Sequence, residues 1–216
     1  IKILSGIHAP DQGRILLGGK DVRIASPRDA RALGISLVPQ DTLAVPELSI
    51  GRNILLGIEQ GRTRRGILTK PERDRVWEAL HRIGATFDPE TPAKELGVPH
   101  LRLAQIARAL LQPGKLMVLD EPTAVLSEPD AENLLERLEV LRDEGHAILY
   151  VTHRLSEVMR LADRTTILRD GQLVGAYERG DLDRDETVRL IARDVAEKPR
   201  PMVTDIGNAE ELASDS

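Results

Sequence analysis

The chain has no cysteine among its 216 residues, and only 2% of its residues are aromatic. The lack of cysteine excludes disulfides, thiolate metal sites and cysteine nucleophiles, and it is easiest to reconcile with a cytosolic chain. The lack of aromatic residues means that the core must consist of Leu, Ile, Val and Ala, which suits a buried parallel sheet covered by helices. Because 41% of the residues are hydrophobic, the chain can form one domain with a substantial core.

Long apolar runs and regions of a single charge are also absent. No apolar run approaches the roughly 18 residues of a membrane-spanning helix, so we expect none. The net charge is −5, and the acidic and basic residues are interspersed, which gives no indication of nucleic-acid binding. Arg62, Arg64 and Arg65 form a short basic cluster without aromatic residues between them, and we interpret this cluster as a solvated loop.

The most informative segment is residues 116–123, which read Leu-Met-Val-Leu-Asp-Glu-Pro-Thr. An apolar run that stops on two carboxylates is typical of a buried parallel strand that ends at the rim of a sheet. Asp120 is then placed to hold Mg²⁺, directly or through water, and Glu121 to orient or deprotonate an attacking water. This is the pairing that nucleoside triphosphate hydrolysis needs.

A second apolar run, residues 147–152, ends at His153. If this run forms a neighbouring strand, His153 can reach the same rim as Asp120 and Glu121 and contact a γ-phosphate. Taken alone, the two acids could be only a polar cap before Pro122, and the histidine an ordinary residue at the start of a helix. The spacing of the two runs between strong helical segments favours the catalytic interpretation.

Turn and capping residues predict the remaining elements. Strands and helices alternate, which is typical of a layered α/β domain. We expect the end of a helix at residues 1–5, and further helices at residues 27–33, 49–57, 70–83, 101–112, 128–144, 154–162 and 185–193. Strands are expected at residues 35–40, 116–120 and 147–152, and hairpins at the Gly18–Gly19 and Asp170–Gly171 turns.

Together these features resemble the ATP-binding cassette (ABC) family over roughly residues 1–190, and more specifically the first nucleotide-binding domain of bacterial carbohydrate importers. Residues 116–123 match the family's Walker B strand. Gln40 matches the glutamine that senses Mg²⁺ and the membrane partner, and His153 matches the switch histidine. Weaker matches lie at the helix after the phosphate-binding loop, the dimer-contacting loop, a late hairpin and three sugar-importer segments: residues 1–7, 124–127, 170–171, 26–30, 44–50 and 156–158.

The resemblance implies an α/β, P-loop NTPase-like nucleotide-binding domain with a mostly parallel sheet. It places this domain at residues 1–195, its helical subdomain at about 47–112, and an acidic tail or linker at 196–216. It implies ATP and Mg²⁺ as the bound nucleotide and metal. It also implies ATP hydrolysis that energises a bacterial importer, for a carbohydrate, at the cytoplasmic face of the inner membrane.

The partners that the resemblance implies are transmembrane permease subunits, a second ABC cassette in a tandem or homodimer, and indirectly a periplasmic solute-binding protein. Residues 41–50 would contact the permease. No nucleic-acid partner is expected. Two cassettes are needed because neither surface alone surrounds the triphosphate.

The resemblance also assigns roles to single residues. Glu121, His153 and Gln40 would be catalytic, and Asp120 and Gln40 would hold Mg²⁺. Gln40, Asp120 and His153 would contact the nucleotide of this chain's own site. Gly97 would contact the nucleotide of the partner's site, as part of a degenerate signature.

The phosphate-binding loop of the family, G-x-x-x-x-G-K-[ST], does not occur in the sequence. By the family pattern its lysine would lie about four residues before Ile1, so we expect a chain truncated after this loop and lacking the strand before it. The alternative is a genuinely loop-less protein. In either case residues 1–216 alone should bind ATP weakly, because the backbone N–H groups that cradle phosphate are absent.

The family's LSGGQ-type signature is also altered. The matching residues, 96–100, read Leu-Gly-Val-Pro-His. Gly97 replaces a serine whose hydroxyl bonds the γ-phosphate, Pro99 replaces a glycine and has no N–H, and His100 replaces a glutamine. In this family the signature completes the partner's ATP site, so the defect would fall there. A shifted loop with another donor could compensate instead.

Two other functions remain open from the sequence. The first is a truncated or degenerate cassette that binds a partner without turnover. The second is a soluble ABC ATPase that acts on ribosomes or DNA rather than in transport.

Overall fold

The computed structural model describes residues 1–41, 44–58, 67–114 and 116–181. The chain divides into two compact units, each described here by itself. The first holds residues 1–13 and 23–153, and the second holds residues 14–22 and the chain from Arg154 onward. The predicted basic cluster at 62–65, the helix at 185–193 and the tail at 196–216 lie outside the described residues.

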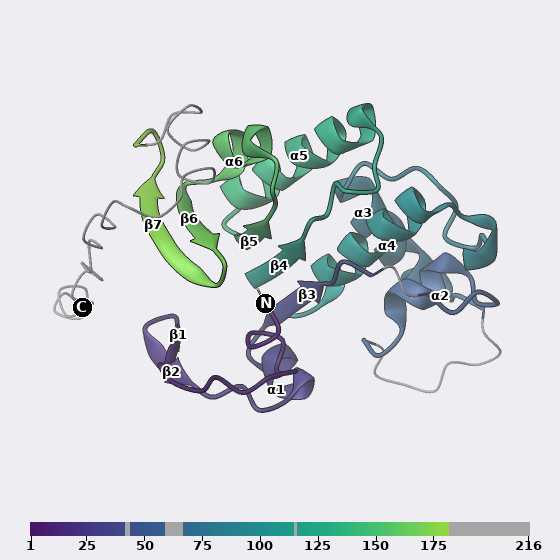
Figure 1. Cartoon of the computed structure of the whole chain (residues 1–216). Helices are drawn as coiled ribbons and strands as arrows, with labels where there is room; N and C mark the ends of the chain where they lie inside the picture. Colours follow the sequence, from purple (N-terminus) through teal and green to yellow (C-terminus); the bar gives the residue numbers. More distant parts are fainter. Residues whose placement is uncertain (42–43, 59–66, 115, 182–216) are drawn as a thin grey trace, which may run out of the picture. The chain divides into compact units, whose positions relative to one another are not determined.

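A parallel sheet of three strands forms the centre of the first unit, in the order β3-β4-β5 (Figure 1). The strands are β3 (Ile35–Val38), β4 (Leu116–Asp120) and β5 (Ala147–Val151). Their register pairs Val38 with Leu119, and Asp120 with Val151, so the three carboxyl ends lie at one edge. The predicted parallel strands and α/β class are confirmed.

The strand β3 is shorter than predicted. It ends at Val38 rather than at Gln40. The reason is Pro39, which has no N–H to donate to the ladder of the sheet. Gln40 therefore lies in the segment that follows the strand and not on the strand itself.

Capping residues define most helices of the first unit. The hydroxyls of Ser26, Ser49 and Ser127 each accept a backbone N–H at the start of a helix. At Thr69, the capping box with Glu72 does the same. The helices are α1 (Pro27–Ala32), α2 (Ile50–Leu55), α3 (Lys70–Arg82), η1 (Ala93–Glu95), α4 (Val98–Leu111) and α5 (Glu128–Asp143). At residues 1–5 the chain makes one hydrogen-bonded turn, from Ser5 N–H to the Ile1 carbonyl at 3.0 Å.

The helices α2, α3 and α4 pack against one another through aliphatic side chains (Figure 1). Ile54, Leu80 and Ile106 are at most 1% exposed, which gives this group a core without aromatic residues. These helices lie within the span 47–112 that was predicted as a helical subdomain, and that division remains a prediction. On α5, the four leucines predicted to face inward are all buried: Leu134, Leu135, Leu138 and Leu141.

The described part of the second unit, residues 14–22 and 154–181, contains two hairpins and one helix. The elements are β1 (Ile15–Leu17), β2 (Lys20–Val22), α6 (Leu155–Leu161), β6 (Arg164–Arg169) and β7 (Gln172–Glu178). The predicted turns are observed: Gly18 and Gly19 both adopt positive φ, as a type I′ turn requires, and Asp170 and Gly171 do the same. Among the described residues, none of the helices combines the length and apolar character needed to cross a membrane.

Candidate active site

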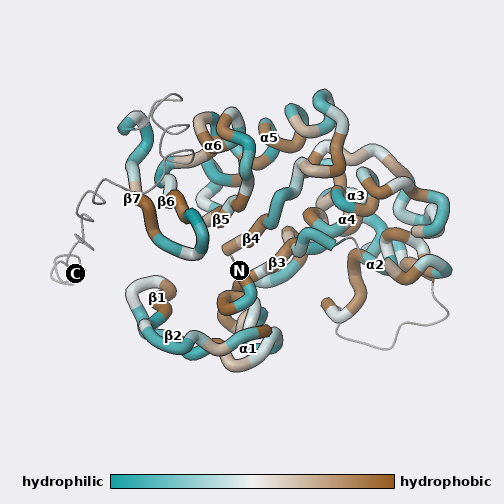
Figure 2. Tube along the Cα trace, in the orientation of Figure 1, coloured by the Kyte–Doolittle hydropathy of each residue, from teal (hydrophilic) through white to brown (hydrophobic). Residues whose placement is uncertain are grey.

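The strand β4 carries two carboxylates to the edge of the sheet. Along the chain, the hydrophobic colour of β4 changes to hydrophilic where the strand ends (Figure 2). Leu119 is fully buried, Asp120 is half-buried, and the Glu121 side chain is 30% exposed. The predicted position of both acids at the rim is therefore observed.

The backbone of Glu121 adopts a left-handed conformation, with φ of 45°. Side chains other than glycine rarely take this conformation, and it persists only where neighbouring groups hold it. Here the N–H of Glu121 donates to the Val151 carbonyl of β5 at 2.9 Å, and the Glu121 carbonyl accepts from Ala124 N–H at 3.2 Å. Such conformations cluster at functional sites, so this one supports a functional role for Glu121.

The side chains of Glu121 and His153 are in contact. Oε1 of Glu121 lies 3.1 Å from Nδ1 of His153, which follows the end of β5. A carboxylate can only accept a hydrogen bond, so this contact requires a proton on Nδ1 while Glu121 is charged. The His153 side chain is 71% exposed, and its Nε2 lies on the opposite side of the ring from the atom bonded to Glu121.

Gln40 lies at the same edge of the sheet. The strand β3 runs parallel to β4 and ends at Val38, two residues before Gln40. Gln40 is exposed, whereas its main-chain carbonyl accepts a hydrogen bond from the buried Arg102 of α4. The structure thus places Gln40, Asp120, Glu121 and His153 at one edge.

The donors at this edge suit Mg²⁺. Asp120 and Gln40 offer a carboxylate and an amide oxygen, which are hard ligands of the kind Mg²⁺ prefers. Within the described ranges, no cluster of three or more His, Cys, Asp or Glu side chains could hold a metal ion. Mg²⁺ usually binds through one or two carboxylates together with substrate phosphates and water.

Gly97 lies at the start of α4. It is the exposed N-cap residue and provides no side-chain cap. The helix begins at Val98 rather than at the predicted residue 101. Proline is tolerated in the first turn of a helix, so Pro99 does not delay the start. Residues 98–100 therefore form the first turn of α4 instead of a loop.

The sequence interpretation missed the contribution of Arg102. This side chain is 1% exposed and donates hydrogen bonds to main-chain carbonyls in the Gln40 segment. Burial lowers the pKa of its guanidinium below the usual range, while Asp120 and Asp41 partly oppose that shift. The signal in the sequence was an arginine within an apolar helical run, but such a run does not identify the partner.

Comparison with known proteins agrees with this geometry. Residues 1–124 match the family model described as ABC transporter. The chain is 41% identical to ribose import ATP-binding protein RbsA 2 of Rubrobacter xylanophilus, over 88% of this chain and 37% of that protein. It is 38% identical to ribose import ATP-binding protein RbsA 2 of Streptomyces coelicolor, over 97% of this chain and 40% of that protein. The chain thus spans about two fifths of the length of these relatives.

A solved structure shows the same fold. A nucleotide-free ATP-binding cassette from an ABC transporter superposes with a TM-score of 0.72 at 22% identity, covering 88% of this chain and 77% of that one. A dimeric ATP-binding cassette in a post-hydrolysis state, bound to ADP and phosphate, gives a TM-score of 0.69 at 18% identity, covering 82% and 78%. At such identities the likeness concerns the fold.

Proposed function

This chain belongs to the ABC transporter family, and on that premise we propose that it contributes an ATP-hydrolysing site that energises a bacterial importer for a carbohydrate. The observation that carries the proposal is the contact of Glu121 with His153 at the carboxyl edge of the parallel sheet. An acid and a histidine in contact at such an edge can act on a water and a phosphoryl group bound beside them.

Glu121 is proposed to orient or deprotonate the attacking water. One carboxylate oxygen, Oε1, is engaged by His153 Nδ1, and this leaves Oε2 to accept a hydrogen bond or a proton from water. The left-handed backbone at Glu121, which a hydrogen bond to β5 holds, fixes the backbone position from which this side chain extends. A fixed base needs less reorganisation when the water attacks.

His153 is proposed to contact the γ-phosphate through Nε2. If Nδ1 donates to Glu121, the ring donates on both sides only when it carries two protons. A positively charged ring would then stabilise the negative charge on the phosphoryl oxygens in the transition state.

Asp120 and Gln40 are proposed to hold Mg²⁺ with their oxygen atoms. When bound, Mg²⁺ would neutralise charge on the β- and γ-phosphates of ATP. The half-buried position of Asp120 at the end of β4, in register with Val151, keeps its carboxylate at the edge where Glu121 lies.

The proposed partners are permease subunits and a second cassette, with a solute-binding protein acting indirectly, at the cytoplasmic face of the inner membrane. The names of the relatives, ribose import ATP-binding proteins, support an importer and a sugar. The proposed permease contact, residues 41–50, leads into α2, and residues 42–43 of it lie outside the described ranges.

Part of that segment has a defined shape. The buried amide of Asn53 accepts from Val45 N–H at 2.7 Å and donates to the carbonyls of Val45, Leu48 and Ser49 at 3.0 to 3.3 Å. A surface that binds a partner benefits from such pre-organisation, because less freedom is lost on binding.

The test is ATP-driven sugar uptake by proteoliposomes that contain the permease and a full-length version of this protein with a phosphate-binding loop. Ribose is the first substrate to use, because the relatives carry its name. We expect uptake that requires ATP and is lost in Glu121→Gln, while the matched control Glu128→Gln, at an exposed position of α5, retains it. If Glu121→Gln leaves ATP hydrolysis unchanged, the proposed catalytic site is wrong. If ATP is hydrolysed without uptake of any sugar, the proposed carbohydrate substrate is wrong.

A further inference from the structure

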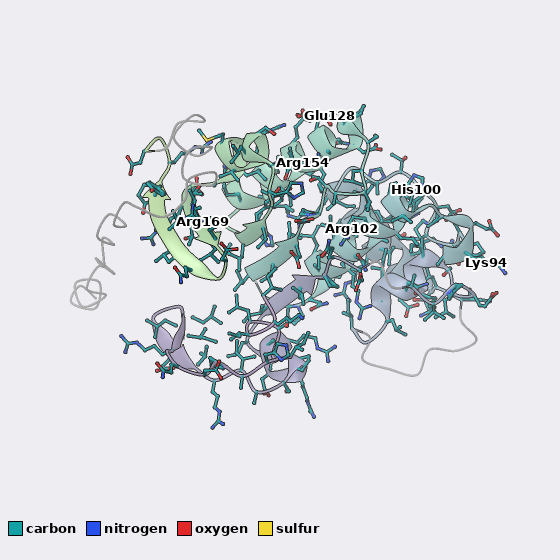
Figure 3. All side chains as sticks on the ribbon, in the orientation of Figure 1. Lys94, His100, Arg102, Glu128, Arg154 and Arg169 are labelled. Carbon is teal, nitrogen blue, oxygen red and sulfur yellow. The ribbon has the colours of Figure 1, made fainter. Side chains whose placement is uncertain are left out.

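Two side chains of α4 hold three successive main-chain carbonyls next to the sheet edge. The Arg102 guanidinium donates to the carbonyls of Pro39 and Gln40. The Gln105 amide donates to the carbonyl of Asp41 at 3.0 Å, and its oxygen accepts from Arg102 at 3.3 Å. Figure 3 labels Arg102 on α4, close along the helix to His100. Gln40 is therefore the middle residue of a segment whose backbone is fixed from one helix.

Burying the charged side chain of Arg102 costs free energy, and the position of Arg102 suggests a function that offsets this cost. A guanidinium that is 1% exposed has lost its hydration, and the Nε atom finds no hydrogen-bond partner in the described part of the chain. An aliphatic side chain would fill the same space between helix and sheet without that penalty. The planar fork of arginine, however, can satisfy two carbonyls at once in a fixed geometry.

The fixed backbone contrasts with the free side chain of Gln40. The residue is exposed, so its amide is available to a ligand at the edge. Its carbonyl and both neighbouring carbonyls are bonded, so the point from which the amide extends is set. Losing a group that orients a metal ligand typically costs roughly 10- to 100-fold in metal affinity or activity.

We propose that Arg102, assisted by Gln105, is a positioning residue that holds Gln40 in place for Mg²⁺. The proposal rests on the proposed function, since it assigns Arg102 a role only through the metal-binding amide of Gln40. Arg102 does not itself contact the nucleotide or the metal. Its effect should therefore appear in the dependence of ATP hydrolysis on Mg²⁺ and should require the Gln40 side chain.

The experiment measures ATP hydrolysis, and equilibrium binding of ATP, against Mg²⁺ concentration in a version of the chain that includes a phosphate-binding loop. The variants are Gln40→Ala, Arg102→Lys, the double variant and Gln105→Ala. Arg102→Lys keeps the charge and removes the fork. We expect it to raise the half-saturating Mg²⁺ concentration about tenfold, the lower end for groups that orient a metal ligand. Gln105→Ala should raise it about threefold, as expected for one neutral hydrogen bond.

A matched control separates positioning from packing. Arg108→Lys makes the same change on the same helix, at an arginine that is half-buried and whose pKa is also lowered by burial. It should leave the half-saturating Mg²⁺ concentration within about twofold of wild type. Urea midpoints of all variants show whether a variant is folded, and Gln105→Ala provides the test if Arg102→Lys does not fold.

The proposal is tested by comparing the effect of Arg102→Lys in the presence and in the absence of the Gln40 side chain. If Arg102 acts through Gln40, Arg102→Lys should change the Mg²⁺ dependence by less than about twofold when Gln40 is already alanine. Equal effects with and without the Gln40 side chain would overturn the proposal, as would no effect in folded Arg102→Lys and Gln105→Ala. Hydrolysis insensitive to Glu121→Gln would instead show that the proposed function itself is wrong.

Discussion

The sheet edge and the start of α4 differ in both chemistry and backbone conformation. At the sheet edge, formed by Asp120, Glu121 and His153, an acid and a histidine are in contact, and the Glu121 backbone is held at φ of 45°. At the helix start, Gly97 has a relaxed φ of −71° and contributes no cap. A strained backbone thus occurs where the reactive groups gather, and an unstrained one where they are missing.

The helix start keeps its structure without its side-chain chemistry. The 14-residue helix α4 still begins at Val98, and its N-terminal dipole is still available to an anion. The side-chain hydroxyl and one backbone donor of the family signature are absent, at Gly97 and Pro99. If the start of α4 faces the phosphate of a partner's site, as the sequence predicts, the helix keeps the geometry of that site but lacks the groups specific for phosphate.

The largest expected effect concerns the sheet edge. Glu121→Gln in the full-length protein with a phosphate-binding loop should retain ATP binding and lose on the order of 10²-fold or more in turnover. In the proposed role the carboxylate acts on water rather than on nucleotide, and glutamine keeps its size. Single-turnover hydrolysis and equilibrium ATP binding measure the two quantities. Turnover within about threefold of wild type would remove Glu121 from the role of base.

The next effect concerns the helix start and has the opposite sign. Gly97→Ser with Pro99→Gly restores the hydroxyl and the backbone donor of the signature, and it should accelerate hydrolysis at the partner's site. One such donor can be worth on the order of 10²-fold in rate. The measurement needs a partner cassette with its own functional site and Glu121→Gln in this chain, so that only the partner's site turns over. An unchanged rate there would favour a shifted loop with another donor.

The carboxylate of Glu72 has a structural role, in contrast to the chemical role proposed for Glu121. Glu72 completes the capping box at Thr69, with its Oε2 accepting from the Thr69 N–H at 2.7 Å. It also pairs with the buried Arg52 at 3.3 Å. The Thr69 backbone hydrogen bond, helped by Arg52, lowers the pKa of Glu72 despite an opposing contribution from burial. Its charged form therefore stabilises the folded state.

Glu72→Gln should lower the stability by about 1 kcal/mol near neutral pH and leave turnover unchanged, the reverse of Glu121→Gln. Because the folded-state pKa is lowered, the stabilisation is present above the ordinary pKa of glutamate and is lost as pH falls through the lowered value. Urea unfolding of both proteins at neutral pH and at about pH 4 tests this. A difference between them that grows on acidification would contradict the assignment.

The sheet edge was largely predictable because local patterns specify it. An apolar run that ends on Asp120 and Glu121, and another that ends at His153, are sufficient to place these side chains at one rim. The caps at Ser26, Ser49 and Ser127 were equally readable, because each cap depends on residues within one helical turn.

The rest depends on partners distant in the sequence. Arg102 bonds the Gln40 carbonyl across 62 residues, and an arginine in an apolar run does not reveal which backbone it will meet. The positive φ of Glu121 likewise results from the hydrogen bond of its N–H to Val151 on β5, and no local preference of glutamate predicts it.

The smallest expected effect tests whether the helix start is truly unstrained. Gly97→Ser alone should stabilise the domain by a few tenths of a kcal/mol, because serine is a slightly better N-cap than glycine and can accept the N–H of His100. The added Cβ would meet only the Pro99 Cδ, at 3.6 Å, an ordinary contact, and φ of −71° suits any residue. Urea midpoints of wild type, Gly97→Ser and the uncapping control Gly97→Ala measure the effect, with alanine expected to be the least stable. A destabilised serine variant would show that Gly97 is needed for close approach, and the contrast between a strained sheet edge and a relaxed helix start would then fail.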